Sequence, residues 1–484
     1  MNRSHSPSGR GPAGKRRLPT PAPAVQAVEP YVNGRVLAWA ALQQAEKDEA
    51  FLQEIFADFD SRHHLSAAER ALAVDIASGV IRRRRTLDRI LETRVARPRS
   101  QTEPELWQIL RMGACQLLFA RTPQHAAVAA TVELCRLLGR ERWTGFVNGI
   151  LRSICRLTET APDTPVPSIP SRSTLPVPGG RWLQLTEDIF PDPTSDTVAW
   201  FGDAFSLPSV LAARWVSRMD QQDLLSTGFF CCEPPTITLR VNRLVSDTAT
   251  VVEQLAKVGC EVLPGHLPCS LLLPRSQRID QLPGWTAGHW SVQDESAMQA
   301  GFLLDPRPSE NILDLCAAPG GKSAHLAELS QDKAIITACD VSERRLQRVR
   351  DNAHRLNLTS VHTRLISRDG SDLPAGPFDA AIVDAPCTNT GVLARRPEAR
   401  WRFTEQSQQE LVVLQTRLLL EAVQRLRPGG RVVYSTCSIE PAENLQVVQN
   451  VLAAFPQLQL IQQNEHLPGR PADGAWQCLL RSPG

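Results

Sequence analysis

Two cysteines follow two short apolar segments in the last third of the chain. Cys387 lies three residues after Asp384, just beyond the segment 378–386, and Cys437 lies within the segment 430–438. Both segments have the length and character of strands, and neighbouring parallel strands end at the same edge of a sheet. A lone cysteine is ordinarily a small buried hydrophobe. Two cysteines at adjacent strand ends, one close to an aspartate, instead form a set that could carry out a reaction.

The reaction that needs such a set is alkylation of a pyrimidine at carbon 5. Carbon 5 of cytosine is too weak a nucleophile to take a methyl group directly from a sulfonium. A thiolate that adds to carbon 6 makes carbon 5 nucleophilic, and after transfer a base removes the C5 proton and the thiol is eliminated. An acid near N3 would stabilise the adduct, and Asp384 is the candidate. To donate a proton there, its carboxyl would have to be buried. The residues alone leave open which cysteine attacks.

A glycine-containing turn ahead of these cysteines predicts a nucleotide-type cofactor. The segment Asp314–Lys322 (DLCAAPGGK) joins a strand to a helix, where glycines let the backbone approach a ligand and amide N–H groups are free. The next strand ends at Asp340, placed to accept the hydroxyls of a ribose, and the following one leads to Asp369, where an adenine could lie. The spacing is not that of a Walker loop. We therefore expect an adenosyl cofactor, S-adenosylmethionine.

The elements that position these residues form a doubly wound α/β pattern over residues 291–484. Strands are expected at 311–317, 334–340, 361–366, 378–386 and 430–438, with helices at 321–330, 342–357 and 405–427. A ligand of such a domain binds outside the carboxyl ends of the strands. This is the edge at which the cysteines and aspartates are expected.

The rest of the chain divides by composition into four segments. Residues 1–30 are a basic tail rich in Pro, Ser and Gly, which we expect to be disordered, and residues 31–157 have the periodicity of an all-α domain. Ser66, followed three residues later by Glu69, is the expected N-cap of one helix. Residues 158–198 are a Pro- and Ser-rich linker, and residues 199–290 are a small α+β domain.

Composition excludes several classes of protein. The chain has 484 residues, of which 42% are hydrophobic, and it has no apolar run near the roughly 20 residues that cross a bilayer. No signal peptide begins it, so we expect a cytoplasmic protein without a membrane partner. The twelve cysteines are scattered without a CxxC pair, which predicts neither a metal site nor a disulfide framework.

Charge is unevenly distributed along the chain. Residues 1–160 carry 24 Lys and Arg against 16 Asp and Glu, although the net charge of the whole chain is only +2. A basic N-terminal third fits a polyanionic partner, and it equally fits an ordinary solvated surface. Composition does not decide between the two.

Three motifs closely resemble the Sun/Fmu-type (RsmB-like) bacterial 16S ribosomal RNA cytosine-C5 methyltransferases. They are the DLCAAPGGK segment, the DAPC segment followed by TGVLARRPEARW, and YSTCSIEPAEN. Residues 109–152 look like the NusB-like RNA-binding domain of that family, and residues 234–242 and 290–300 look like its small ferredoxin- or RRM-like domain. The resemblance implies a multidomain fold, with the NusB-like domain first and a Rossmann-like class I methyltransferase domain last.

The resemblance also implies roles for individual residues. The cysteine of the TC pair, Cys437, would be the nucleophile, and the cysteine of the PC pair, Cys387, would assist release of the methylated RNA. Asp384 would lie near both cofactor and base, and Lys322 would complete the catalytic set. The implied cofactor-binding residues are Cys316, Ala317, Ala318, Pro319, Gly320, Gly321, Lys322, Asp340, Asp369 and Asp384.

The chain departs from the family pattern at two places. Thr388-Asn389 replaces a serine followed by a small residue, which changes the base pocket, and the C-terminus reads DGAWQCLLR rather than ending in a glycine-phenylalanine strand. The expected partner is small-subunit ribosomal RNA, and the expected state is a monomer. Two alternatives stay open: the same chemistry on transfer RNA or another RNA, and a non-catalytic RNA-binding protein. DNA cytosine methylation is disfavoured, because the downstream ENV acid of that family is absent.

Overall fold

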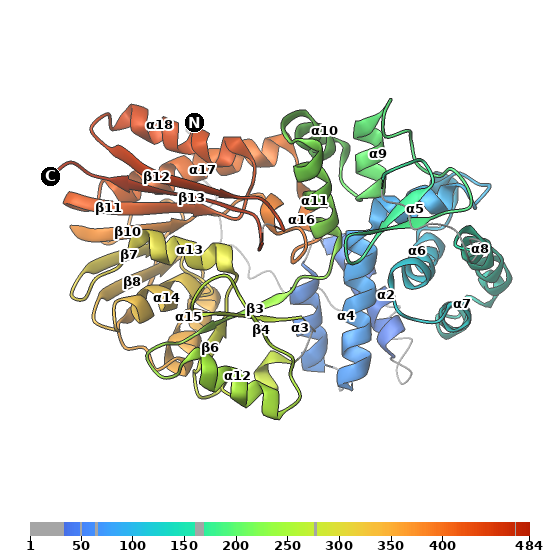
Figure 1. Ribbon diagram of the computed structural model, residues 1–484, viewed down its shortest axis with the longest axis horizontal. Helices are drawn as coiled ribbons and strands as arrows, with labels where there is room; N and C mark the ends of the chain where they lie inside the picture. The colour runs from blue at the N-terminus through green and yellow to red at the C-terminus, as the bar shows by residue number, and fades with distance from the viewer. Residues whose placement is uncertain (1–32, 49–50, 63–65, 160–168, 275–277, 470) are drawn as a thin grey trace, which may run out of the picture.

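The computed structural model describes residues 33–48, 51–62, 66–159, 169–274, 278–469 and 471–484 (Figure 1). The predicted basic tail, residues 1–30, lies outside the described residues. The described chain builds a helical N-terminal part, a small antiparallel sheet and a large mixed sheet covered by helices on both faces. The multidomain fold class predicted from the sequence is therefore confirmed.

The N-terminal part is a bundle of amphipathic helices around one apolar core. Its helices are α2 (Gly34–Asp48), α3 (Leu52–Arg62), α4 (Ala67–Arg82), α5 (Arg84–Glu92), α6 (Pro104–Phe119), α7 (Gln124–Leu137) and α8 (Thr144–Leu157). The side chain of Ser66 caps α4 by accepting a hydrogen bond from the Glu69 amide at 3.2 Å, as the sequence predicted.

The segment expected to be a linker is folded over its described residues. Strands β1 (Thr174–Val177) and β2 (Arg181–Gln184) form an antiparallel hairpin. The indole of Trp182 lies 5.0–6.2 Å, centroid to centroid, from the rings of Trp200, Phe205 and Phe229. The linker prediction is wrong for these residues, because a few large aromatic side chains bury enough apolar surface to order a proline-rich stretch.

The small sheet begins later than the sequence suggested. Helices α9 (Thr197–Ala204), α10 (Ser209–Arg218) and α11 (Gln221–Cys232) pack into the N-terminal core rather than onto the small sheet. The small sheet has the antiparallel order β4-β5-β3-β6, and α12 (Thr248–Lys257) packs against it. Its strands are β3 (Ile237–Val241), β4 (Leu263–Pro264), β5 (Ser270–Leu273) and β6 (Trp290–Val292).

The large sheet has the strand order β12-β13-β11-β10-β7-β8-β9. The strands are β7 (Asn311–Leu315), β8 (Ile335–Asp340), β9 (Val361–Leu365), β10 (Phe378–Asp384), β11 (Leu426–Thr436), β12 (Gln459–His466) and β13 (Ala475–Arg481). The five strands predicted from the sequence are β7 to β11, and they pair in parallel. The C-terminal segment that differs from the family pattern, DGAWQCLLR, contains β13, which pairs antiparallel with β11.

Helices cover both faces of this sheet (Figure 1). The helices are α13 (Glu295–Leu304), α14 (Gly321–Leu329), α15 (Glu343–Arg355), α17 (Glu405–Val423) and α18 (Leu445–Ala454), whereas the short α16 (Ala399–Arg402) packs into the N-terminal core. Residues of α13, α14 and α15 share one buried cluster with the sheet, and residues of α17 and α18 share another on the opposite face. Burial on both faces explains why the strands read as continuous apolar runs in the sequence.

An arginine joins the helical part to the large domain. Arg400 of α16 is fully buried, and its guanidinium donates to the carbonyl oxygens of Arg82 at 3.0 Å and Cys231 at 2.6 Å, which lie in α4 and α11. Arg82 in turn donates to the carbonyl of Ala394 at 3.1 Å. The segment that follows Cys387 in the chain is therefore anchored on the N-terminal helices.

Three arginines of the N-terminal third have their charge satisfied inside the fold. Arg82 and Arg83, in the run Arg82–Arg85, are buried, and Arg83 donates to the carbonyl of Pro176 at 2.8 Å. Arg85 forms an ion pair with Asp203 at 2.6 Å. The charge count therefore overstates what this part of the chain offers to a polyanion.

Candidate active site

The topology of the large sheet brings the two cysteines together. Strands β10 and β11 are parallel neighbours, and Asp384 pairs with Ser435 in the register. The loops that follow the two strands therefore leave the sheet side by side. The sulfur atoms of Cys387 and Cys437 lie 3.1 Å apart. This is hydrogen-bonding distance for two thiols, so one sulfur donates its hydrogen to the other.

The two cysteines differ in environment. Cys387 is buried, and Cys437 is partly exposed. The hydrogen bond to Cys437, together with burial, raises the pKa of the Cys387 thiol well above its ordinary value. Cys387 is thus held as a neutral thiol, whereas Cys437 is the sulfur that a substrate can reach.

An ion pair lies beside the cysteines. Lys322, at the start of α14, places its Nζ 2.8 Å from Oδ2 of Asp384, at the end of β10. Burial alone would lower the pKa of Lys322, but the charge of Asp384 and the hydrogen bond to it outweigh burial, and the pKa is raised. The ammonium of Lys322 is therefore charged and holds the carboxylate in place.

This ion pair corrects the hypothesis that Asp384 is a buried proton donor. The Asp384 side chain is 37% exposed, and its close neighbour is a cation rather than an apolar wall. The burial that a proton donor at this position would need is therefore absent. In this structure Asp384 is suited to accept hydrogen bonds, for example from an exocyclic amino group.

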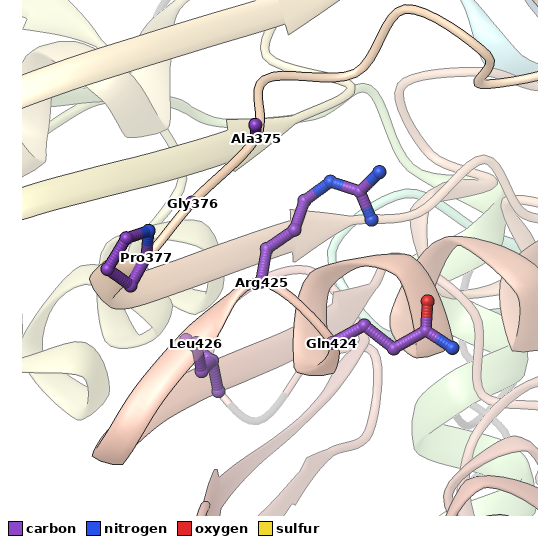
Figure 2. A pocket seen from close by; sticks show the side chains of 6 residues that line it. All are labelled: Ala375, Gly376, Pro377, Gln424, Arg425 and Leu426. Carbon is purple, nitrogen blue, oxygen red and sulfur yellow. The ribbon is translucent and has the colours of Figure 1, made fainter.

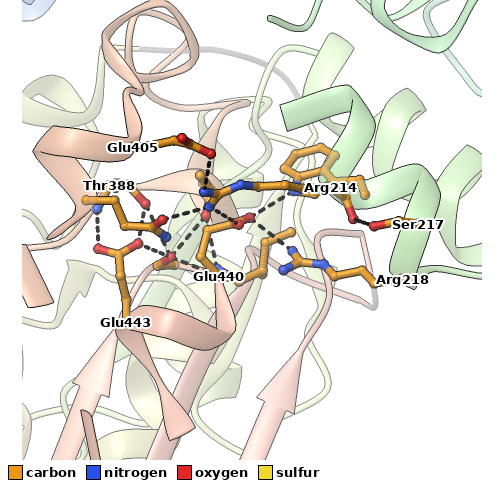
Figure 3. A network of polar contacts seen from close by, with 12 residues as sticks. Arg214, Ser217, Arg218, Thr388, Glu405, Glu440 and Glu443 are labelled. Atoms are coloured by element: carbon orange, nitrogen blue, oxygen red, sulfur yellow. Dashed lines mark hydrogen bonds and ion pairs between the residues drawn. The ribbon is translucent and has the colours of Figure 1, made fainter. Parts of the chain in front are cut away.

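The buried carboxylate of Glu443 forms hydrogen bonds with the loops that carry the two cysteines (Figure 3). Glu443 is fully buried and accepts hydrogen bonds from the amide of Thr388 at 2.8 Å, from Ser438 Oγ at 2.6 Å and from Gln415 Nε2 at 3.0 Å. The hydroxyl of Thr388 also donates to it. Because Thr388 follows Cys387 and Ser438 follows Cys437, Glu443 ties the two loops to each other. Sequence reasoning missed this role, although Glu443 lies inside the motif YSTCSIEPAEN.

The next carboxylate connects the loop after Cys437 to the helical part (Figure 3). Glu440 accepts hydrogen bonds from Trp215 Nε1 at 2.9 Å and from Arg218 at 3.0 Å, and it lies 3.4 Å from Arg214. All three donors come from α10. Both cysteine loops are thus braced against the N-terminal core, since Arg400 anchors the other loop.

The predicted cofactor turn lies at the same edge of the sheet. Cys316 and Gly320 adopt positive φ angles of 65° and 100°. A Cβ on Gly320 would lie 3.1 Å from the Cα of Val349, so this close approach of loop to helix requires glycine. Gly321 has open space around it, which leaves room for a ligand beside the N-terminus of α14.

The carboxylates at the next strand ends differ from each other. Asp340, at the end of β8, is buried, and its Oδ2 has an ion-pair contact with Arg345 at 3.3 Å but accepts no hydrogen bond within the described residues. An unfilled buried acceptor at this position fits the hydroxyls of a ribose. Asp369 is exposed, and hydrogen bonds with Ser367 and Ser371 lower its pKa to about 2. It lies in the turn after β9 and stabilises that turn.

Asp314, the first residue of the turn motif, is a buried carboxyl with an unusual pKa. Ser323 Oγ donates to its Oδ2 at 2.5 Å, and its Oδ1 has no hydrogen-bond partner in the described part of the chain. Burial raises the pKa of Asp314 to about 7 from an ordinary value of 3.8. The folded protein therefore binds this proton more tightly than the unfolded chain does.

The raised pKa of Asp314 predicts a stability difference that depends on pH. Between about pH 4 and 7 the unfolded chain ionises this carboxyl group while the folded protein keeps it protonated. The free energy of unfolding of the wild type therefore falls as the pH rises through this window. The side chain of Asp314→Asn stays neutral at every pH. The free energy of unfolding of this variant, relative to that of the wild type, should therefore increase by a few kcal/mol from about pH 4 to pH 7 and stay constant above about pH 7. Thermal unfolding of both proteins across the window checks this. A difference that does not change with pH would contradict it.

The cavity at the opposite edge of the large sheet has no such chemistry. It has a volume of about 380 Å³ and lies at the amino ends of β10 and β11 (Figure 2). Its lining residues are Ala375, Gly376, Pro377, Gln424, Arg425 and Leu426. None of them is a nucleophile or an acid, so the candidate active site remains at the carboxyl edge.

Within the ranges that the structure describes, no group of three or more His, Cys, Asp or Glu side chains could bind a metal ion. Among the helices of the same residues, none has the length and hydrophobicity needed to cross a membrane.

Comparison with known proteins identifies the family. Residues 301–475 match the family described as 16S rRNA methyltransferase RsmB/F, and residues 32–156 match the NusB family. Ribosomal RNA small subunit methyltransferase B of Xylella fastidiosa (strain 9a5c) is 36% identical over 391 residues, covering 80% of this chain and 82% of that protein. A probable methyltransferase B of Synechocystis sp. is 31% identical over 426 residues, covering 87% and 89%.

A solved structure shows the same fold. The crystal structure of PH0851 superposes with a TM-score of 0.69 at 24% identity, covering 92% of this chain and 98% of that one. The arrangement of helical part, small sheet and large sheet is therefore shared by a known structure over nearly its whole length. The sequence relatives and the two family matches show that the chain belongs to the RsmB/F family of 16S rRNA methyltransferases, with a NusB-like domain ahead of the catalytic domain.

Proposed function

We propose that this protein transfers a methyl group from S-adenosylmethionine to carbon 5 of a cytosine in 16S ribosomal RNA, through a covalent bond between Cys437 and carbon 6. The observation that carries the proposal is the pair of sulfur atoms 3.1 Å apart beside the Lys322–Asp384 ion pair. A methyltransferase that alkylates a nitrogen or an oxygen needs no thiol. Two thiols at the cofactor edge suit a reaction that must both form and break a carbon–sulfur bond.

The turn from Cys316 to Lys322, with Asp340, would hold the cofactor. Asp340 offers a buried acceptor for the ribose, Gly320 and Gly321 allow close backbone approach, and Asp369 shapes the turn next to the adenine position. Bound there, S-adenosylmethionine supplies an electrophilic methyl group on a sulfonium. The NusB-like residues 32–156 would contribute to binding the RNA.

The remaining steps belong to residues of this chain. The thiolate of Cys437 adds to carbon 6, and the electron pair released into the ring makes carbon 5 nucleophilic. Asp384, held by Lys322, accepts a hydrogen bond from the base and orients it. After methyl transfer a proton acceptor removes the C5 proton, and the C6–S bond breaks. Cys387 donates a hydrogen bond to the sulfur of Cys437 as it leaves carbon 6.

The product nucleoside tests this proposal. Full-length protein is incubated with methyl-labelled S-adenosylmethionine and a 16S rRNA transcript, and the RNA is digested to nucleosides and separated. The proposal requires label in 5-methylcytidine. Label in another nucleoside would contradict the C5 chemistry, label acquired only with transfer RNA would favour that alternative substrate, and RNA binding without label would favour a non-catalytic protein.

A further inference from the structure

Asn389 stands between the two cysteines, at a position where the family pattern has a small residue. Its backbone has a φ of 62°, a left-handed conformation that asparagine tolerates better than most residues. Its side chain lies between the loops that carry Cys387 and Cys437 and forms a hydrogen bond with each of them. Asn389, which replaces the small residue of the family pattern, therefore contacts the sulfur of Cys437.

Three hydrogen bonds hold the carboxamide of Asn389. Its Nδ2 donates to the carbonyl oxygen of Cys387 at 2.8 Å. Its Oδ1 accepts from Nη1 of Arg396 at 3.1 Å and from the thiol of Cys437 at 3.2 Å. Arg396 is exposed, and its guanidinium also lies over the ring of Phe51, 5.8 Å from the centroid.

The partners of Asn389 determine which way its amide points. A carbonyl oxygen only accepts and a guanidinium only donates, so Nδ2 must face Cys387 and Oδ1 must face Arg396. The atom next to Cys437 is therefore an acceptor, and the Cys437 thiol turns its hydrogen toward it. Because the hydrogen of Cys437 is already donated to Asn389, the hydrogen bond between the two sulfurs can form only with Cys387 as donor and Cys437 as acceptor.

We propose that Asn389, oriented by Arg396, is a positioning residue that sets the polarity of the thiol pair. This inference rests on the proposed function of Cys437 as nucleophile. With Asn389 present, Cys387 keeps its hydrogen aimed at the Cys437 sulfur, so that sulfur is solvated by a donor as its charge develops. Without it, the hydrogen bond between the two thiols can also form with Cys437 as the donor, a direction that must be reversed before Cys437 can act as a thiolate.

The arrangement also gives a structural reason for the division of roles between the cysteines. Cys387 is buried and is the donor of the pair, while Cys437 is partly exposed and is the acceptor. Family resemblance alone assigned Cys437 as the nucleophile. The polarity imposed by Asn389 selects the same sulfur from the geometry of this chain.

A double-mutant cycle tests the proposal. Asn389→Gly deletes the carboxamide at a backbone angle that glycine adopts freely, and Arg396→Met removes the exposed guanidinium. We expect kcat to fall about tenfold in Asn389→Gly and about threefold in Arg396→Met, with KM for RNA and cofactor within about twofold of wild type. Because Arg396 acts through Asn389, the double variant should lose about tenfold, not the roughly thirtyfold of independent effects. Arg307→Gln, at the amino edge of the sheet, is the matched arginine control.

Alkylation of the free protein separates this inference from the proposed function. Iodoacetamide labelling followed by peptide mass spectrometry measures how strongly Cys437 is labelled in preference to Cys387. The preference should fall several-fold in both single variants and stay at the wild-type level in Arg307→Gln. If wild type methylates cytosine but the two variants keep its kcat, or if their effects add, the inference is overturned while the proposed function stands. If wild type transfers no methyl group, the proposed function fails, and an unchanged labelling preference overturns the inference as well.

Discussion

Cys437→Ala is expected to abolish methyl transfer to RNA, with a loss of about a thousandfold or more. The neighbouring Cys387 cannot replace it as nucleophile, because Cys387 is buried and the pKa of its thiol is held well above the ordinary value. RNA binding should be retained, since the variant removes one sulfur atom and leaves every arginine and lysine in place. Transfer of labelled methyl groups to 16S rRNA under single-turnover conditions measures the effect.

The matched control for this variant is Cys155→Ala. Cys155 is also partly exposed, but it lies in α8 of the helical domain. It should keep wild-type activity. Activity of Cys437→Ala within tenfold of wild type would rule out a covalent bond through this sulfur and leave the family assignment without its proposed chemistry.

Cys387→Ala should instead trap the RNA on the enzyme. Its thiol is 3.1 Å from the Cys437 sulfur and is the donor expected to assist departure of that sulfur from carbon 6. Without it the C6–S bond still forms, but it breaks slowly, so a protein–RNA adduct should accumulate as a slowly migrating band on a denaturing gel. We expect the adduct to become the dominant form of the enzyme, with multiple turnover reduced at least about tenfold.

The double variant Cys387→Ala/Cys437→Ala is the control for the trapped adduct. It should give no band, because the sulfur that forms the bond is gone. A band with Cys437→Ala alone, and none with Cys387→Ala, would show that the two cysteines have the opposite roles.

The catalytic domain was the part of the fold most open to prediction from sequence. Strands buried on both faces, such as Phe378–Asp384, read as unbroken apolar runs, and a parallel sheet places their ends at one edge. Local pattern and topology agree there, so the proximity of Cys387 and Cys437 followed from general rules. The position of the turn Asp314–Lys322 at this edge was predictable for the same reason, because it joins a strand of the sheet to the helix that follows.

The segment 158–198 shows where local pattern misleads. Proline and serine content favoured a linker, but the aromatic rings of Trp182 and Phe190 are buried in the helical core. A few large side chains outweigh many weak turn signals, and their partners, such as Trp200 and Phe205, lie too far along the chain for local pattern to find.

Charges were the hardest features to interpret without coordinates. The excess of Lys and Arg in residues 1–160 fitted a polyanionic partner as well as a solvated surface, yet the guanidiniums of Arg82 and Arg83 bond backbone carbonyls inside the fold. Asp384 was expected to be a buried acid, but Lys322 lies against it. In each case the partner that decides the role of the charge comes from a distant part of the sequence.

The identity of the residue that carries the RNA in the trapped adduct tests the covalent mechanism most directly. The adduct formed by Cys387→Ala is digested with nuclease and protease, and the modified peptide is sequenced by mass spectrometry. We predict a single cytidine nucleotide, methylated at carbon 5, attached to Cys437. A nucleotide attached to any other residue, or methylation of RNA by this variant without any adduct, would contradict the mechanism.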